Sequence, residues 1–237
     1  MSKKIVITGA TKGIGRAIAE KFALCGWCVA ACARKTDEVE ALLSFFQTNT
    51  PSPDSKFITQ VCDVSNKEQL KSFASKINKE WGAVDVLVNN AGVFLPGQII
   101  NEADGQLEKL METNLYSAYN LSRFLVTDMM EKKEGHIFNI SSVAGLQAYN
   151  NGGSYSISKF AMMGLSKALR EELKQHGIRV TALMPGATLT DSWMGTSLPP
   201  DRFMKTEDVA ELVWSIYHLS KNTDVEEVLL RPLLGDI

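Results

Sequence analysis

The chain has 237 residues, 45% of them hydrophobic, and its formal net charge at neutral pH is −2. A chain of this length can bury a substantial core, and we expect one domain spanning residues 1–237. Charges of opposite sign are interspersed, so neither nucleic acid nor an anionic membrane surface is an expected partner. No apolar stretch approaches the length of a membrane span, and the first residues enter a strand pattern at once, so we expect a cytoplasmic protein.

Short apolar runs alternate with longer amphipathic stretches, a pattern typical of βαβ units and a parallel sheet. The apolar runs predict strands at residues 4–8, 28–33, 57–62, 84–89, 135–141, 178–184 and 226–231. The amphipathic stretches predict helices near 14–25, 36–48, 66–80, 104–131, 155–175 and 206–219. The fourth stretch is expected to hold two helices, with a break near Thr113. Right-handed crossovers then give an α/β fold, a Rossmann-like doubly wound sheet with helices on both faces.

Two cysteines, Cys25 and Cys28, have the C-x-x-C spacing of a redox or zinc motif. Gly26 between them is typical of a helix cap, and Cys28 begins an apolar run, so small buried residues at a helix-strand junction are the favoured interpretation. No second C-x-x-C or histidine pair completes a tetrahedral site. We therefore predict no metal ion.

The first predicted strand leads directly into a glycine-rich turn, Thr8–Gly15, and then into an alanine-rich helix. Gly9 would allow the tight turn, Gly13 would let the backbone approach a pyrophosphate, and Gly15 would let helix and strand pack closely. The spacing is G-x-x-x-G-x-G, and no G-K-[ST] closes it as in a Walker loop. Its position after the first strand favours a dinucleotide site over a purely structural turn.

The end of the second predicted strand, Ala33-Arg34-Lys35, bears on the choice of cofactor. An acidic residue here would hold the ribose 2′-hydroxyl of NAD, whereas an arginine would accept the 2′-phosphate of NADP. Arg34, with Lys12 nearby, supplies cations and no competing carboxylate, so we predict NADP(H). The alternative is that Arg34 and Lys35 are solvated loop charges.

Tyr155 and Lys159 are four residues apart in a predicted helix, and residues at that spacing share one helix face. An ammonium group at Lys159 would stabilise the phenolate of Tyr155 and lower its pKa toward neutrality, which would make the tyrosine an acid-base catalyst. Tyr217 and Lys221 have the same spacing. The pattern alone therefore does not identify the catalytic pair.

With these motifs the chain resembles the short-chain dehydrogenase/reductase family over essentially its whole length. The matching positions follow one another in the family's order: Thr8–Gly15, Asp63-Val64, Asn89–Gly92, Asn114, Ser142, Tyr155, Lys159 and Pro185-Gly186. The family has a serine thirteen residues before the catalytic tyrosine, and that count leads from Tyr155 to Ser142 but from Tyr217 to Met204. The resemblance thus selects Tyr155. Adjacent strand residues face opposite sides, so we choose Ser142 and keep Ser141 as the structural alternative.

The resemblance implies an NADP(H)-dependent oxidoreductase that interconverts a carbonyl and a secondary alcohol by hydride transfer. Tyr155 would be the general acid or base, and Ser142 would hydrogen-bond the substrate oxygen. Lys159 would lower the tyrosine pKa and bind the nicotinamide ribose, while Asn114 would help to hold a relay water. The implied cofactor residues are Gly9, Thr11, Lys12, Gly13, Ile14, Gly15, Arg34, Asp63, Val64, Asn90, Ala91, Gly92, Tyr155, Lys159, Pro185, Gly186, Thr188 and Thr190.

Substrate contacts are expected in the variable segments, including the long irregular stretch 186–203. The expected contacts are Ser142, Leu95, Leu146, Gln147, Tyr155 and Trp193. The variable segments are apolar with a few amides and hold no cationic clamp, which favours a neutral or weakly polar carbonyl. The pattern most resembles reductases of 3-oxoacyl thioesters, but their Val-Asp-Gly-Gly ending is absent. A carbonyl or diketone reductase, or a small hydroxy-acid dehydrogenase, therefore stays open, and so does acyl carrier protein as a partner.

Two other function classes fit the motifs less well than an oxidoreductase does. A non-enzymatic NADP(H)-binding sensor would typically lack the serine, tyrosine or lysine, and all three are present here. A methyltransferase would leave Asn89–Gly92 and the Tyr155/Lys159 pair as coincidences. The helix 155–176 has Ala161, Leu165, Leu169 and Leu173 along one stripe and Phe160 and Gly164 outside it. A helix that is apolar on more than one side predicts a homodimer or homotetramer.

Overall fold

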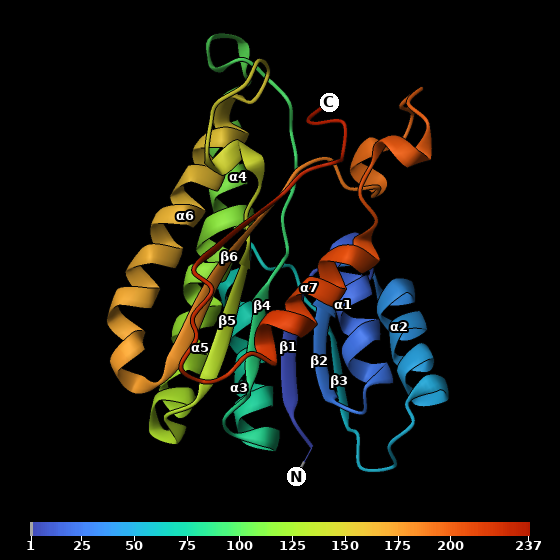
Figure 1. Ribbon diagram of the computed structural model, residues 1–237, viewed down its shortest axis with the longest axis vertical. Coiled ribbons are helices and arrows are strands. Elements are labelled where there is room, and N and C mark those ends of the chain that lie inside the picture. The colour runs from blue at the N-terminus through green and yellow to red at the C-terminus, as the bar shows by residue number, and fades with distance from the viewer. Residues whose placement is uncertain (1) are drawn as a thin grey trace.

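Seven parallel strands form the centre of the computed structural model, which describes residues 2–237 (Figure 1). They are β1 (Lys4–Thr8), β2 (Cys28–Ala33), β3 (Phe57–Val61), β4 (Val86–Asn89), β5 (Gly135–Ile140), β6 (Ile178–Pro185) and β7 (Glu227–Leu230). Their spatial order is β3-β2-β1-β4-β5-β6-β7, and every neighbouring pair is parallel. The predicted doubly wound sheet is confirmed, and each predicted strand agrees with the observed one to within two residues at either end.

The direction in which the strands are added reverses at β1, which has β2 on one side and β4 on the other. Ile5 of β1 pairs with Val29 of β2 and with Val86 of β4. At such a point the connections from two adjacent strands leave in opposite directions and open a crevice at their carboxyl ends. The topology therefore favours a binding site beside the ends of β1 and β4.

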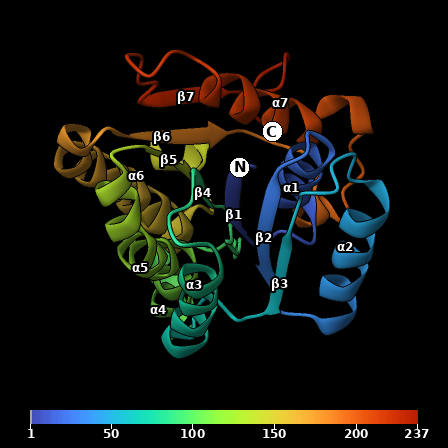
Figure 2. The same ribbon diagram turned by 90° about the horizontal axis from the view of Figure 1, so that it is seen from below.

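Helices cover both faces of the sheet (Figure 2). One face carries α1 (Gly13–Leu24), α2 (Thr36–Asn49) and α7 (Thr206–Tyr217). The other carries α3 (Lys67–Trp81), α5 (Ser117–Lys132) and α6 (Gly153–Leu173). Strand side chains alternate between the two faces, so Ile5 and Ile7 pack beneath the first group of helices and Val6 packs beneath the second. The two cores fix the strand ends that carry the site.

The fourth helical stretch differs from the expected pair of helices with a break near Thr113. The short α4 (Gln106–Met111) continues into α5 through a π-helical turn at Glu112–Tyr116. A π turn adds one residue to the helical ladder, so it shifts the side-chain register without ending the helix. Asn114 lies in this turn and is fully buried.

The cysteines and the helices bear on metal binding and on membrane spans. Cys25 is exposed at the end of α1, and Cys28 is buried as the first residue of β2. Among residues 2–237, no cluster of three or more His, Cys, Asp or Glu side chains is arranged to hold a metal ion. Over the same range, no helix combines the length and the apolar character needed to cross a membrane.

Candidate active site

A cavity of about 1030 Å³ opens at the carboxyl edge of the sheet. The segments that follow β1 to β6 all contribute to its lining, as is usual for ligand sites of open α/β sheets. The predicted site residues that line it are Gly9, Thr11, Lys12, Gly13, Ile14, Arg34, Asp63, Val64, Asn90, Ala91, Gly92, Ser142, Gln147, Tyr155, Lys159, Pro185, Gly186, Thr188, Thr190 and Trp193. Four others do not line it, namely Gly15, Leu95, Leu146 and Asn114.

Gly15 lies behind the glycine loop and not on its surface. A Cβ atom at this position would be 2.3 Å from Nδ2 of Asn90 and 2.4 Å from the carbonyl oxygen of Gly9, so only glycine fits. The same Asn90 amide donates to the carbonyls of Thr8, at 2.9 Å, and Gly9, at 3.1 Å. The turn after β1 and the segment after β4 are therefore tied together at the crevice.

The amino end of α1 borders the cavity. Gly13 and Ile14, its first two residues, are part of the lining, and the helix is 12 residues long. Gly13 has a left-handed φ of 53°, and a Cβ atom there would lie 3.0 Å from Cγ2 of Thr190. A helix N-terminus with free backbone N–H groups suits an anionic group. This part of the cavity thus fits the pyrophosphate of a dinucleotide.

The end of the cavity beyond β2 is lined by Lys12 and Arg34, which are predicted cofactor residues, and also by Lys35 and Glu38. The expectation that no carboxylate competes with these cations is therefore wrong. Glu38 lies in the first turn of α2, and its carboxylate forms ion pairs of 3.2 Å with Lys12 and 3.1 Å with Lys35. The Lys35–Glu38 spacing of i, i+3 on a helix is the signal from which this pair could have been predicted.

Tyr155 and Lys159 lie on one face of α6 and both line the cavity. Lys159 is only 5% exposed, and its Nζ donates to the carbonyl of Ile140, at the end of β5, over 3.0 Å. The same Nζ lies 5.7 Å from the centre of the Tyr155 ring. Burial lowers the pKa of Lys159 to about 8. The helix thus holds a buried ammonium group beside the phenol at the wall of the cavity.

The pKa of Tyr155 moves in the opposite direction to the expected one. Burial raises it to about 12, and a hydrogen bond with Ser142 offsets only part of this rise. The ammonium group of Lys159, 5.7 Å from the ring centre, is not among the causes that shift this pKa. At neutral pH Tyr155 is therefore a protonated phenol.

Ser141 and Ser142 both border the cavity, but their hydroxyl groups have different partners. The Ser141 hydroxyl donates to the backbone carbonyl of Lys159 over 3.2 Å and is buried. The Ser142 hydroxyl accepts a hydrogen bond of 3.2 Å from the backbone N–H of Ala144. Its own proton is free to be donated to the Tyr155 oxygen, an interaction that lowers the pKa of Tyr155. Ser141 thus supports the helix backbone, whereas Ser142 is the serine that reaches the phenol.

Asn114 lies behind the cavity wall. Its side-chain oxygen accepts from the backbone N–H of Val93 at 2.8 Å, and its amide donates to the Val93 carbonyl at 3.0 Å. The amide also donates to the hydroxyl of Ser158 on α6 over 3.0 Å. Asn114 therefore connects the segment after β4 to the catalytic turn of α6, and its expected part in a water relay stays a prediction.

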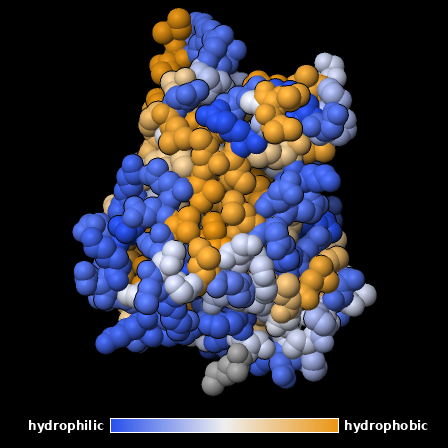
Figure 3. Space-filling model, in the orientation of Figure 1, coloured by the Kyte–Doolittle hydropathy of each residue, from blue (hydrophilic) through white to orange (hydrophobic). Residues whose placement is uncertain are grey.

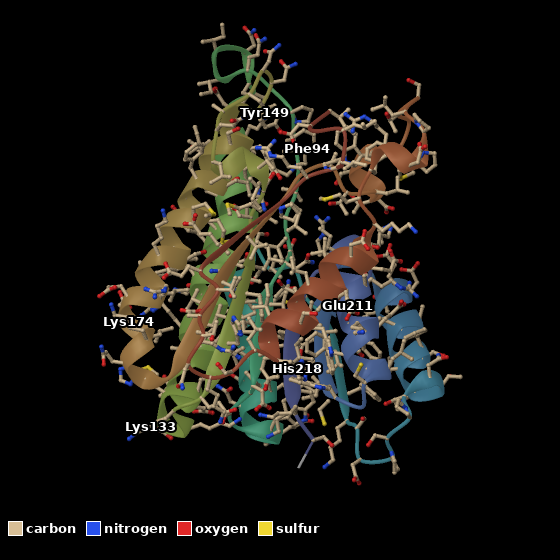
Figure 4. The ribbon with its side chains drawn as sticks, in the orientation of Figure 1. Phe94, Lys133, Tyr149, Lys174, Glu211 and His218 are labelled. Carbon is tan, nitrogen blue, oxygen red and sulfur yellow. The ribbon has the colours of Figure 1, made fainter. Side chains whose placement is uncertain are left out.

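The second Tyr/Lys pair is far from the cavity lining. Tyr217 packs edge-on against Trp27, with ring centres 4.9 Å apart. Lys221 forms an ion pair of 2.9 Å with Glu134. Figure 4 labels the neighbouring His218 at the lower end of α7, away from Phe94 and Tyr149. The choice of Tyr155 over Tyr217 is consistent with this arrangement.

Aromatic residues line the end of the cavity near Tyr155. Phe94 packs edge-on against Tyr155 with ring centres 4.9 Å apart, and Tyr149 is also part of the lining (Figure 4). Leu95 and Leu146, which were expected to contact substrate, lie outside the lining. Both are in irregular segments, where the direction of a side chain does not follow a fixed period.

The segment after β7 turns back over the cavity, a feature that no motif indicated. Asp236 and Ile237 are part of the lining. The guanidinium of Arg202 donates to the carbonyls of Gly235 at 3.1 Å, Leu234 at 3.4 Å and Asp236 at 3.1 Å. Figure 3 shows apolar atoms on this face between α6 and α7, and Leu234 is 77% exposed. Polar contacts with the 186–203 stretch, more than burial, therefore hold this segment.

The parallel sheet, the glycine turn at its switch point and the shared cavity define a dinucleotide-binding α/β protein. The family model for short chain dehydrogenases matches residues 3–200, and the chain belongs to this family of oxidoreductases.

Three similar proteins have different activities. A sepiapterin reductase from Chlorobaculum tepidum is 32% identical, with 100% of this chain and 99% of the relative covered. A 3-oxoacyl-[acyl-carrier-protein] reductase from Haemophilus influenzae is 31% identical, with 89% and 88% covered. An alcohol dehydrogenase from the archaeon Thermococcus sibiricus, complexed with 5-hydroxy-NADP, superposes with a TM-score of 0.89 at 27% identity and covers 100% of this chain and 99% of its own.

Proposed function

We propose that the protein transfers a hydride between NADP(H) and a substrate carbonyl or secondary alcohol, with Tyr155 as the general acid or base. The observation that carries this proposal is that Ser142, Tyr155 and Lys159 line the same cavity as the glycine loop. The groups that would hold a dinucleotide and those that would move a proton therefore border one cavity. The cofactor would supply the hydride chemistry, and the chain would orient the cofactor and the substrate and supply a proton.

The proposed cofactor contacts follow the cavity from one end to the other. The first N–H groups of α1 would hold the pyrophosphate, and Lys12, Arg34 and Lys35 would hold a 2′-phosphate. Asp63 and Val64 would border the adenine. The similar alcohol dehydrogenase complexed with 5-hydroxy-NADP supports a phosphorylated dinucleotide.

The proposed proton donor is Tyr155, which keeps its proton at neutral pH because its pKa is raised to about 12. A protonated phenol suits reduction, in which the hydride reaches the carbonyl carbon while the oxygen takes the phenolic proton. Ser142 would donate a hydrogen bond to the same oxygen and stabilise its developing negative charge. Lys159, with a pKa of about 8, is mostly charged at neutral pH and would stabilise the phenolate that remains.

The proposed substrate is a neutral or weakly polar carbonyl compound. Phe94, Tyr149 and Trp193 supply aromatic surface at that end of the cavity, and Gln147 supplies an amide. A 3-oxoacyl thioester is one candidate, supported by the similar reductase of such thioesters. A small ketone, diketone or hydroxy acid is the other, supported by the similar sepiapterin reductase and alcohol dehydrogenase. NADPH oxidation measured against a panel of thioesters and ketones would separate the two.

A homodimer or homotetramer is part of the proposal. Helix α6 buries Met162 and Leu169 but leaves Ile157 and Phe160 at 40% and 45% exposed. A long helix with apolar residues on its outer face favours contact with a second copy. Light scattering at micromolar concentration should give at least a dimer, and a monomer would contradict this part.

The test of the mechanism compares two tyrosines. Tyr155→Phe should lower kcat on the order of a thousandfold, because it removes the transferred proton, while the Kd for NADPH stays within about twofold. Tyr217→Phe is the matched control, since it removes the same hydroxyl from the other Tyr/Lys pair, and it should retain activity. An active Tyr155→Phe enzyme would refute the mechanism.

A further inference from the structure

Two of the three cations at the far end of the cavity, Lys12 and Lys35, are already paired within the chain. One carboxylate oxygen of Glu38, Oε1, lies 3.2 Å from Nζ of Lys12 and 3.1 Å from Nζ of Lys35. The other oxygen, Oε2, accepts a hydrogen bond of 2.9 Å from the hydroxyl of Thr11. Arg34 also borders this space and has no ion pair within residues 2–237. Glu38 is therefore the anion that Lys12, Lys35 and Thr11 bind when no ligand is present.

The Glu38 carboxyl is ionised at neutral pH. Burial acts to raise its pKa, but the hydrogen bond from Thr11 and the ion pairs with Lys35 and Lys12 outweigh this effect and lower the pKa. Lys12 has a second carboxylate partner, Asp191, at 2.9 Å on the opposite side of the cavity mouth. The positive charge available to an incoming phosphate is thus smaller than the three cations alone would provide.

We propose that Glu38 limits the preference of this protein for NADP(H) over NAD(H), because the 2′-phosphate must replace Glu38 as the partner of Lys12 and Lys35. The inference rests on the proposed function, in which Lys12, Arg34 and Lys35 receive that phosphate. A cofactor with a free 2′-hydroxyl brings no second anion and leaves the Glu38 ion pairs in place. Glu38 therefore weakens the binding of NADP(H) and leaves the binding of NAD(H) unchanged.

The opposite role for Glu38 would be to bind the ribose of NAD directly, as acidic residues at the end of the second strand do. The structure argues against this role, because both Glu38 oxygens already have partners in Thr11, Lys12 and Lys35. The two roles make opposite predictions for a neutral replacement. Loss of a competing anion strengthens binding of the 2′-phosphate, whereas loss of a ribose ligand weakens binding of the 2′-hydroxyl form.

The experiment titrates the complete protein with adenosine 2′,5′-bisphosphate and with adenosine 5′-monophosphate, which differ in the 2′-phosphate. Glu38→Gln should bind the bisphosphate roughly fivefold more tightly, as expected when exposed ion pairs no longer compete. Its Kd for the monophosphate should stay within about twofold. The ratio of Kd values for NADH and NADPH should rise by the same factor.

Two further variants make the result decisive. Asp37→Asn is the matched control, because Asp37 is an exposed carboxylate in the same helical turn with no contact to Lys12 or Lys35. It should change neither Kd. Arg34→Ala should weaken the binding of the bisphosphate and leave the binding of the monophosphate unchanged. This variant tests whether the 2′-phosphate site exists.

The outcomes separate the two levels of the argument. If wild-type protein does not prefer the bisphosphate and Arg34→Ala changes nothing, the proposed NADP(H) site is wrong. If Arg34→Ala weakens the binding of the bisphosphate but Glu38→Gln behaves like Asp37→Asn, the proposed NADP(H) site is supported and the proposed role of Glu38 is refuted. Weaker monophosphate binding by Glu38→Gln would assign Glu38 to the ribose hydroxyls instead.

Discussion

The two ends of the cavity are built in different ways. At the cofactor end the lining consists largely of backbone and small residues at the ends of β1 to β4, held by contacts such as the Asn90 amide on Thr8 and Gly9. At the substrate end it consists of side chains from irregular segments and from residues 236–237, a segment held by Arg202 and by the ion pair of Arg231 with Asp236. The first end depends on strand register, and the second on a few long-range contacts.

This difference has a physical consequence for function. A site made of backbone at strand ends can accept one cofactor in many related proteins, because the sheet itself sets its shape. A site made of loop side chains can change without disturbing the fold. The similar proteins fit this division, because the sepiapterin reductase, the 3-oxoacyl-[acyl-carrier-protein] reductase and the alcohol dehydrogenase are named for different substrates.

The largest expected effect concerns Lys159, where the two ends meet. Its pKa falls from 10.5 to about 8 on folding, so the folded chain binds fewer protons than the unfolded chain between these values. The buried charge therefore costs ~3 kcal/mol of unfolding free energy below pH 8, and this cost fades as the pH rises toward 10.5. Lys159→Met should be more stable than wild type at pH 7 but inactive, and its advantage should shrink by pH 9.5.

Urea unfolding at the two pH values measures this effect. Lys167→Met is the control, because Lys167 lies on the same helix with a side chain that is 71% exposed. Its stability relative to wild type should not depend on pH in this window. A Lys159→Met protein that is less stable than wild type at pH 7 would show that the hydrogen bond to Ile140 outweighs the cost of burying the charge.

The next effect tests the rigidity of the cofactor end. Gly15→Ala would place a methyl group 2.3 Å from Nδ2 of Asn90, so the two loops must separate. Overpacking of this kind costs about 1–3 kcal/mol, and the Kd for NADPH should rise by at least about tenfold. Gly164→Ala is the control, because nothing lies within 4 Å of a Cβ atom there. If Gly15→Ala binds NADPH normally, the cofactor end is more adaptable than the structure implies.

The sequence predicted the cofactor end better than the substrate end for reasons that individual residues show. Gly9, Gly13 and Arg34 follow strands whose apolar pattern fixed their bounds, so their positions followed from local sequence. Asp236 was missed because the contact that brings it to the cavity joins Arg202 to residues more than 30 positions later. Such a contact has no local pattern.

Side-chain chemistry was also only partly predictable. The i, i+4 spacing placed Lys159 beside Tyr155 correctly, but not the Ile140 carbonyl that binds its amine. The direction of the Tyr155 pKa shift depends on the burial of the phenol, which no spacing gives. The role of Glu38 was not predicted, because Glu38 lies on the helix beyond the strand end that bears on cofactor choice, although its i, i+3 spacing from Lys35 is a local signal.

A smaller effect is expected from Arg202, which tests whether the segment after β7 shapes the substrate end. Arg202→Met removes three hydrogen bonds to backbone carbonyls of residues 234–236. The KM for a substrate identified by the panel should rise by about tenfold, while the Kd for NADPH stays unchanged. Lys205→Met, which removes an exposed cation just after this loop, should alter neither constant. Equal losses of cofactor and substrate binding would instead indicate general unfolding of the segment.

The smallest effect compares two neighbours in the loop after β5. Tyr149 lines the cavity and Leu146 does not, although the sequence favoured Leu146. Tyr149→Ala should raise KM by about fivefold through loss of aromatic contact, whereas Leu146→Ala should stay within about twofold. Steady-state kinetics on both variants gives the answer, because neither residue touches the glycine loop and cofactor binding should be constant. If Leu146→Ala has the larger effect on KM, the loop rearranges when substrate binds. The shape of the substrate end would then be induced by the substrate.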